Sequence, residues 1–271
     1  MIEAEKSVYR DDYTNITVER DGELEAVLCV TMNRPEKRNA LSLSHMRELI
    51  EVFRTVETDA SVRAVILAGN GPAFCAGHDL GEMVGKDHEF YRETFDVCTE
   101  LMTLVQGVAQ PVIAEVHSIA TAAGCQLAAT CDLVVASEEA RFATPGVRIG
   151  LFCSTPMVAL SRAVGQKKSM EMLLTGDFVG AEEAERIGLV NRVVPKGDLR
   201  ETSRQFARKV CEASPLVVGI GKEAFYRQRE LPTAEAYAYT KEVMSHNATL
   251  RDAQEGMGAF LEKRRPEWTG S

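Results

Sequence analysis

The chain has 271 residues and a formal net charge of -9; 45% of its residues are hydrophobic and 26% are charged. This length and composition are typical of one large globular domain, or one domain with an appendage, whose core needs no disulfide. The acidic balance excludes a general nucleic-acid-binding surface, but it is compatible with a local basic patch for a phosphorylated ligand.

The cysteines and the N-terminus indicate the compartment. The seven cysteines form no CxxC pair and follow no secretory signal, so we expect reduced intracellular thiols. Cys75 and His78 have the spacing of metal ligands, but no second pair accompanies them, and we expect no metal. Residues 1–6 are polar, and no apolar stretch approaches the ~20 residues that cross a bilayer. We therefore expect a cytoplasmic protein with neither a membrane nor a nucleic-acid partner.

The first part of the chain alternates β-rich runs with helical patterns. Short β-rich runs predict strands at 16–18, 26–30, 64–68, 112–116 and 132–136. Apolar residues at helical spacing predict helices over 43–56 and 90–108, and a short helix from Gly124 to about Thr130. This order predicts a mixed α/β core with a weak ββα repeat.

After about residue 156 the sequence is mostly helical. We predict a short helix at 181–187 and a brief strand at 191–195. Four amphipathic helices follow, at 199–212, 215–229, 234–244 and 250–263. Their apolar residues exceed what one small helical cluster buries, so some face another subunit or cover the core. We accordingly expect a core over 1–197 and a helical oligomerisation region over 198–271.

Two glycine-marked turns carry the chemical signal. The first is Phe74–Asp79 and the second is Ala122–Gln126, and each comes after an apolar strand. Backbone N–H groups at the start of a helix have no intrahelical partner and lie at the positive end of the helix dipole. Two such donors that converge on one oxygen stabilise an enolate or a tetrahedral oxyanion. The alternative is a pair of ordinary strand-to-helix turns, since glycine is common there.

Ordered motifs across nearly the whole chain resemble the enoyl-CoA hydratase/isomerase (crotonase) superfamily. The segments that carry the resemblance are Asn33–Leu41, Ala73–Leu80, Ala122–Leu127, Cys131–Leu133, Leu173–Gly176, Ala184–Val190 and Phe260–Trp268. Residues 120–126, 142–146 and 150–156 are closer still to one subgroup. That subgroup is the enoyl-CoA hydratase domain-containing proteins of mitochondria and their bacterial relatives.

The resemblance implies a spiral of ββα units with a helical C-terminal trimerisation region, assembled as a trimer or a dimer of trimers. It implies an acyl-CoA ligand in fatty-acid or related acyl-CoA metabolism, with coenzyme A as part of the substrate and no separate cofactor. The thioester oxygen would sit between the backbone amides of Ala76 and Ala123. The residues expected to meet coenzyme A are Arg34, Lys37, Arg38, Ala76, Gly77, His78, Asp79 and, on a neighbouring subunit's ligand, Phe260 and Lys263.

The chain departs from the hydratase pattern at both acidic positions. By the resemblance, the two usual glutamates correspond to Gln126 and Gly146. A pair of carboxyl groups shares the proton transfers of adding water to a double bond. Glutamine exchanges no proton near neutral pH, although it can hold a water, and glycine supplies only space. A one-glutamate isomerase is disfavoured too, because its base position is also Gly146.

Other groups are candidate substitutes for the missing acid and base. His78 lies in the first turn and His117 ends the strand before the second turn; both are candidates because histidine is the side chain whose ordinary pKa lies closest to neutrality. Ser154 could act as a nucleophile if a base lay nearby, and Cys153 is a second candidate nucleophile. Each has a simpler interpretation: packing or solvated histidines, a buried cysteine, and a serine that caps the helix before Pro156. Asp79 is interpreted as a helix cap.

Three functions are consistent with these residues. The first is an enzyme, of the lyase or isomerase type, that acts on acyl- or enoyl-CoA through non-classical residues. The second is a non-catalytic acyl-CoA-binding or regulatory protein. The third is an ordinary enoyl-CoA hydratase of weak activity that uses a water held by Gln126. The sequence has no GxGxxG turn, P-loop or GxSxG elbow, which disfavours nicotinamide, nucleotide-triphosphate and serine-hydrolase chemistry.

Overall fold

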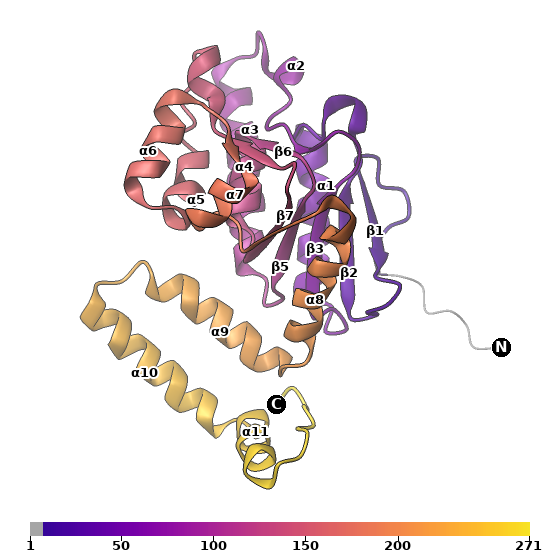
Figure 1. Ribbon diagram of the computed structural model, residues 1–271, viewed down its shortest axis with the longest axis vertical. Helices are drawn as coiled ribbons and strands as arrows, with labels where there is room; N and C mark the ends of the chain where they lie inside the picture. The colour runs from indigo at the N-terminus through magenta and orange to yellow at the C-terminus, as the bar shows by residue number, and fades with distance from the viewer. Residues whose placement is uncertain (1–7) are drawn as a thin grey trace, which may run out of the picture.

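Two β-sheets form the centre of the computed structural model, which describes residues 8–271 (Figure 1). The larger sheet has the strand order β1-β2-β3-β5-β7-β10, and only its β1–β2 pair is antiparallel. Its strands are β1 (Ile16–Arg20), β2 (Val27–Met32), β3 (Ala64–Gly69), β5 (Val112–Val116), β7 (Leu133–Ser137) and β10 (Arg192–Val194). Of the central strands, β3 is a continuous apolar run and β5 is apolar except for the buried Glu115, as expected for parallel strands covered on both faces.

A second sheet lies beside the first and has the order β4-β6-β8-β9. Its strands are β4 (Ala73–Cys75), β6 (Ile119–Thr121), β8 (Arg141–Ala143) and β9 (Val179–Gly180). The chain passes from β3 to β4, from β5 to β6 and from β7 to β8, and each pair of strands precedes a helix. The predicted mixed α/β fold with repeated ββα units is confirmed, although the short strands of the second sheet were not predicted.

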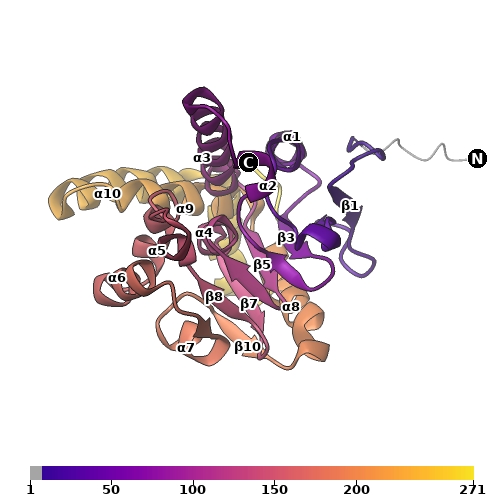
Figure 2. The same ribbon diagram turned by 90° about the horizontal axis from the view of Figure 1, so that it is seen from above.

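Helices cover both faces of the larger sheet (Figure 2). The helices up to residue 186 are α1 (Leu43–Thr58), α2 (Leu80–Met83), α3 (His88–Gly107), α4 (Ala123–Thr130), α5 (Pro156–Ala163), α6 (Gln166–Thr175) and α7 (Ala181–Arg186). Apolar residues of α1 and α3 pack with Val65 and Leu67, and α8 (Leu199–Cys211) packs with Ile66 on the opposite face. Successive side chains of a strand point to opposite faces, so β3 serves both layers.

The last three helices extend away from the sheets as an arm (Figure 1). They are α9 (Pro215–Gln228), α10 (Thr233–Thr249) and α11 (Arg251–Glu262), so α10 is longer than the predicted 234–244. The arm is anchored by Lys222, whose Nζ lies 2.7 Å from Asp132 Oδ2. No residue of α10 is buried within the single chain. The predicted division of the chain at residue 198 remains a prediction. The helix α8 lies beyond residue 198 and packs on the larger sheet, whereas α9, α10 and α11 form the arm.

Candidate functional site

The two glycine turns lie against each other. A Cβ atom placed on Gly77 would lie 2.9 Å from the Ala122 Cβ and 3.3 Å from the Ala123 nitrogen. A Cβ on Gly124 would lie only 2.1 Å from the carbonyl oxygen of Cys75. The hydroxyl of Thr121 also donates to the Ala76 carbonyl at 3.1 Å. Both glycines are therefore required by close backbone approach, and the two turns converge.

The hydrogen bonds of the first turn correct one sequence expectation. The Ala76 N–H donates to the Arg38 carbonyl at 3.0 Å. Because this N–H already has an acceptor, the expectation that Ala76 donates to the thioester oxygen is wrong. Two residues further on, the N–H of His78 has no acceptor among residues 8–271. The same holds for the N–H of Ala123, the first residue of α4. The N–H groups of His78 and Ala123 are thus available, one from each turn; those of Gly77, Gly124 and Cys125 likewise have no backbone acceptor within residues 8–271.

Ala122 supports the second turn in a strained conformation. Its backbone has φ 50° and ψ -120°, a region that residues with a Cβ rarely adopt. Its N–H donates to the Ala143 carbonyl at 2.9 Å, and its own carbonyl accepts from the Gln126 N–H at 3.0 Å. Strain of this kind persists only where the surroundings impose it, and it concentrates at functional sites.

The loop Asn33–Asn39, called the basic loop because it carries Arg34, Lys37 and Arg38, is hydrogen-bonded to the first turn through backbone and side chains. Arg34 donates to the Ala40 carbonyl at 2.7 Å and to Asp79 Oδ2 at 3.1 Å. Arg34 is therefore used to hold the loop, and its expected role at a phosphate is not supported by this conformation. Asp79 also accepts from the Gly81 N–H at 3.2 Å as the N-cap of α2, which confirms its predicted role as a cap. Lys37 and Arg38 are exposed and form no ion pair among residues 8–271.

The His78 side chain is packed beside the turn rather than solvated. Its ring lies edge-on to Phe95 with 5.5 Å between centroids. Neither ring nitrogen has a hydrogen-bond partner of normal geometry within residues 8–271. Burial lowers the pKa of this imidazole, and a Leu41 backbone group opposes the shift. Burial therefore favours the uncharged form of the ring over the imidazolium.

Two buried oxygen atoms flank the second turn without partners. Gln126 is 5% exposed, and its Oε1 has no hydrogen-bond partner in the described part of the chain. Thr144 is fully buried, and its Oγ1 likewise has none there. Thr144 was not among the predicted site residues. The sequence contains no pattern that marks it, because its place follows from the pairing of β8 with β6.

Gly146 corrects a second expectation, since the space at this position is filled. A Cβ on Gly146 would lie 2.4 Å from the Leu151 carbonyl oxygen and 2.8 Å from the Cys153 sulfur. The Gly146 N–H also donates to Cys153 Sγ at 3.3 Å. Burial raises the pKa of the Cys153 thiol, and this N–H partly offsets the rise. Cys153 is therefore a packed thiol that closes the site on one side.

The remaining candidate substitutes lie in structural surroundings. Ser154 is exposed, and its hydroxyl has a 3.5 Å contact with the Phe152 carbonyl. Thr155 is the N-cap of α5 and makes no side-chain cap hydrogen bond, so the predicted serine cap is wrong. His117 Nε2 lies 2.8 Å from the Gly71 carbonyl, where the ring ties two loops together.

Phe260 and Lys263 are far from the turns within one chain. They lie at the end of α11, on the arm that extends away from α2 and α4 (Figure 1). The Phe260 side chain is 82% exposed. If these residues meet a ligand, the ligand belongs to another copy of the chain.

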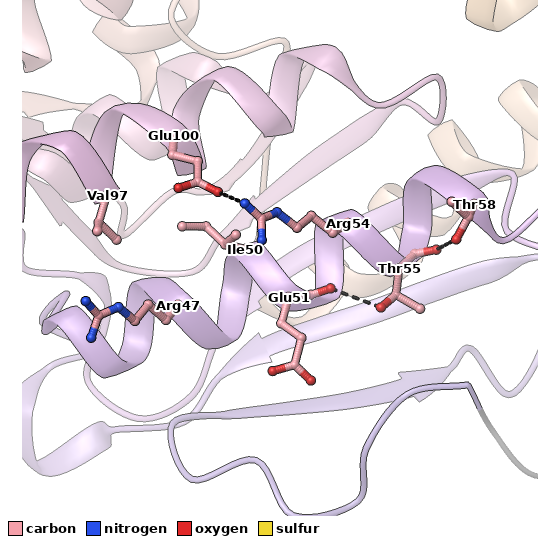
Figure 3. A pocket seen from close by; sticks show the side chains of 8 residues that line it. All are labelled: Arg47, Ile50, Glu51, Arg54, Thr55, Thr58, Val97 and Glu100. Carbon is pink, nitrogen blue, oxygen red and sulfur yellow. Dashed lines mark hydrogen bonds and ion pairs between the residues drawn. The ribbon is translucent and has the colours of Figure 1, made fainter.

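A separate surface groove runs between α1 and α3 (Figure 3). Its arginines face glutamates across the groove: Arg54 bonds Glu100 at 2.5 Å, and Arg47 pairs with Glu93. Both arginines are paired with carboxylates, so the groove offers no unpaired cation to a phosphate. Elsewhere, no helix within residues 8–271 is long and apolar enough to cross a membrane.

The ββα units, two abutting glycine turns and a helical C-terminal arm together define the crotonase class of α/β proteins. The family model described as enoyl-CoA hydratase/isomerase matches residues 22–271, and the chain belongs to this family.

Similar proteins include both named hydratases and domain-containing relatives. The chain is 46% identical to the mitochondrial enoyl-CoA hydratase domain-containing protein 3 of Xenopus laevis, covering 89% of this chain and 83% of the relative. It is 35% identical to the 2,3-dehydroadipyl-CoA hydratase of Escherichia coli, covering 90% and 95%. A crystal structure of enoyl-CoA hydratase from Mycobacterium smegmatis matches with a TM-score of 0.91 and 49% identity, covering 94% and 99%. The cytoplasmic location expected from the sequence remains a prediction, since the named Xenopus relative is mitochondrial.

Proposed function

We propose that this chain binds an acyl- or enoyl-CoA thioester and stabilises its enolate in an oxyanion hole, without a glutamate pair. The observation that carries the proposal is the contact of the two turns, in which Gly77 lies against the Ala122–Ala123 backbone. The available N–H groups of His78 and Ala123 are the two donors to the thioester oxygen. Losing one such donor typically costs ~3 kcal/mol of activation free energy.

The proposed coenzyme A site extends from the first turn to the basic loop. The Arg38 carbonyl accepts from Ala76, so the exposed cations of Lys37 and Arg38 are attached directly beside the turn. Cations with no competing carboxylate suit phosphate oxygens. The acyl-CoA ligand class also agrees with the printed names of relatives, such as the 2,3-dehydroadipyl-CoA hydratase.

The proposed chemistry differs from paired-carboxylate hydration. Gln126 exchanges no proton near neutral pH, and a carboxylate at Gly146 would collide with the Leu151 carbonyl and Cys153. The neutral His78 ring is the titratable side chain of the first turn that has an unpartnered nitrogen. We therefore assign His78 as the candidate base of an enolate-forming reaction in fatty-acid or related acyl-CoA metabolism. Ser154 receives no role, because it is exposed and its hydroxyl contacts a carbonyl.

Oligomerisation is part of the proposal. The arm exposes large apolar side chains, among them Tyr237 and Met244 on α10 and Phe260 and Leu261 on α11. A trimer, or a dimer of trimers, would cover them and bring Phe260 and Lys263 to a neighbour's coenzyme A. Sedimentation of the full chain measures this, and a monomer at micromolar concentration would contradict it.

A panel of thioesters tests the function. Short, medium and long enoyl-CoAs are titrated by calorimetry, and product formation is followed in parallel. The proposal expects binding of at least one thioester and turnover that falls strongly in His78→Ala. Binding without any product favours the alternative of an acyl-CoA-binding or regulatory protein. Rapid hydration that survives His78→Ala favours an ordinary hydratase with a Gln126-held water, and absence of any binding overturns the proposal.

A matched pair of variants tests the phosphate contacts. The double variant Lys37→Ala with Arg38→Ala is expected to weaken thioester binding by about tenfold and to reduce its salt dependence. Lys209→Ala removes an exposed cation from α8, on the opposite face of the sheet, and is expected to change neither.

A further inference from the structure

Leu41, which follows the basic loop, is paired with His78 of the first turn. The Leu41 N–H donates to the Gly77 carbonyl at 2.7 Å, and the Leu41 carbonyl accepts from the Asp79 N–H at 3.1 Å. These two bonds form an isolated parallel bridge between Leu41 and His78. In such a bridge the bonded groups belong to the residues on either side of His78, so the His78 N–H faces away from Leu41. The position of Leu41 therefore sets the direction of this donor.

The carbonyl of Ala40, the preceding residue, is held by two side chains. Arg34 donates to this oxygen at 2.7 Å, and Nδ1 of His45 lies 3.2 Å from it. His45 is at the start of α1, where its backbone N–H donates to the Ser42 hydroxyl at 3.2 Å. The imidazole is thus attached to a long helix, and it fixes the chain next to Leu41 from that helix.

The contact with Ala40 determines the tautomer of the His45 ring. A carbonyl oxygen only accepts, so Nδ1 carries the proton and Nε2 has a lone pair. The side chain is fully buried, and Nε2 has no hydrogen-bond partner within residues 8–271. A second proton would leave a buried N–H without an acceptor, and it would add a positive charge near Arg34. The ring fits this place only while it is neutral.

The carboxylates near the ring are bonded to other groups. Glu48, on the next turn of α1, accepts two backbone N–H groups of the N-terminal segment at 3.0 and 2.8 Å. Glu82 of α2 accepts the first backbone N–H of α1 at 3.0 Å, and Asp79 is paired with Arg34. Burial lowers the pKa of His45, and only the charge of Glu48 and the bond to Ala40 oppose this. An imidazolium would therefore have no hydrogen-bonded countercharge in the described part of the chain.

We propose that His45 is a positioning residue that holds the first turn in its ligand-binding form while the imidazole is neutral. It touches no ligand itself and acts through Ala40 and Leu41 on the N–H of His78. Protonation of the ring releases the Ala40 carbonyl, so the affinity for the thioester falls in acid. The inference rests on the proposed function, which assigns the His78 N–H to the thioester oxygen.

Calorimetry with butyryl-CoA tests the role at about pH 7.5, where the ring is neutral. His45→Leu keeps most of the volume and removes the donor, so it is expected to weaken binding about fivefold, as for one lost hydrogen bond. His45→Asn places an amide N–H where Nδ1 lies and is expected to stay within about twofold of wild type. Val52→Ala is the control, because it removes buried volume two turns further along α1 and should keep the wild-type affinity.

The pH dependence is the second readout, and it decides the question if His45→Leu does not fold. A released ring has the ordinary pKa of 6.5, whereas the held ring has a pKa of about 4. The held form is thus fully favoured above pH ~6.5 and is lost as the pH falls. The wild-type affinity for butyryl-CoA is divided by that of His45→Asn at the same pH, which cancels the titration of the ligand. This ratio is expected to fall about threefold or more between about pH 7 and pH 5, with circular dichroism confirming folded protein.

Each contrary result has a definite meaning. Wild-type affinity in folded His45→Leu, an equal loss in Val52→Ala, or no recovery in His45→Asn overturns the positioning role. A constant affinity ratio between the two pH values overturns it as well. All four leave the proposed function standing, since butyryl-CoA is still bound by wild-type protein. Failure of wild-type protein to bind butyryl-CoA overturns the proposed function and the positioning role together.

Discussion

The first and second turns have similar sequences but are held in different ways. The first turn is attached to the basic loop: Ala76 donates to Arg38, Leu41 donates to Gly77, and Asp79 pairs with Arg34. The second turn is held by sheet pairing, through the bond from Ala122 to Ala143, and by backbone strain at Ala122. One turn therefore depends on charged and titratable neighbours, and the other depends on backbone packing.

The difference shows that two adjacent turns can be held by unlike interactions. The loop that fixes the first turn also carries the exposed cations Lys37 and Arg38, so charge and turn geometry are linked there. The second turn lies deeper, where Ala123 is fully buried and α4 begins directly at the turn. Conditions that alter charge should act mainly on the first turn, and changes of volume should act mainly on the second.

The largest expected effect is steric. Gly124→Ala places a Cβ 2.1 Å from the Cys75 carbonyl oxygen, which forces the two turns apart. We expect a loss of about 3 kcal/mol or more in the free energy of unfolding, measured by urea titration. Gly107→Ala, at a helix end with no heavy atom within 4 Å of the new Cβ, should be neutral or stabilising. Equal stability of Gly124→Ala and wild type would show that the turns are not in contact.

The next effect concerns pH and the first turn. His45 is fully buried beneath the basic loop, with Nδ1 3.2 Å from the Ala40 carbonyl, and burial lowers its pKa from 6.5 to about 4. Between these values the unfolded chain binds a proton that the folded chain excludes. Stability is therefore complete above pH ~6.5 and is lost as the pH falls toward 4, by about 3 kcal/mol.

His45→Asn tests this assignment, because an amide can keep the hydrogen bond to Ala40 and does not titrate. The dependence of unfolding free energy on pH should become shallower over this window. The exposed His246→Asn is the matched control and should leave the slope unchanged. A wild-type slope in His45→Asn would assign the acid sensitivity to other groups.

A smaller effect is expected from the ion pair of the first turn. Asp79→Ala removes both the cap of α2 and the partner of Arg34, whose side chain is 17% exposed. We expect a loss of about 2 kcal/mol in the free energy of unfolding, measured by thermal or urea unfolding, since a largely buried guanidinium is left without its carboxylate. Glu36→Ala, in the exposed part of the same loop, should change stability by less than about 0.5 kcal/mol. Equal effects of the two variants would assign no structural role to the pair.

The smallest effect has the opposite sign. Ala122→Gly removes the Cβ from a residue with φ 50°, so the relief of strain should outweigh the added chain entropy by up to about 1 kcal/mol. Ala129→Gly, within the following helix α4, should instead cost about 1 kcal/mol. Urea titration measures the free energy of unfolding of both variants. A destabilised Ala122→Gly would mean that the packing of the Ala122 methyl group contributes more to stability than its backbone strain costs.

Long helices and strands could be predicted from the sequence, whereas very short strands could not. The strands β3 and β5 and the helices α1 and α3 lie close to their predicted bounds, because long apolar patterns reveal their period. The strands β4, β6, β8 and β9 have two or three residues and no period, so tertiary pairing alone forms them. Thr144 was missed for the same reason, since its burial depends on β8 lying beside β6.

By itself, the sequence determined the ββα order, the two glycine turns and the absence of carboxylates at 126 and 146. Glycine and apolar periodicity are local properties that a sequence displays directly. Only the tertiary structure decided which turn amides are available, because the Ala76 N–H meets a carbonyl from Arg38, a residue distant in the chain. It likewise decided that the space at Gly146 is filled by Cys153 and Leu151, since hydrogen bonding and close packing depend on which segments the fold brings together.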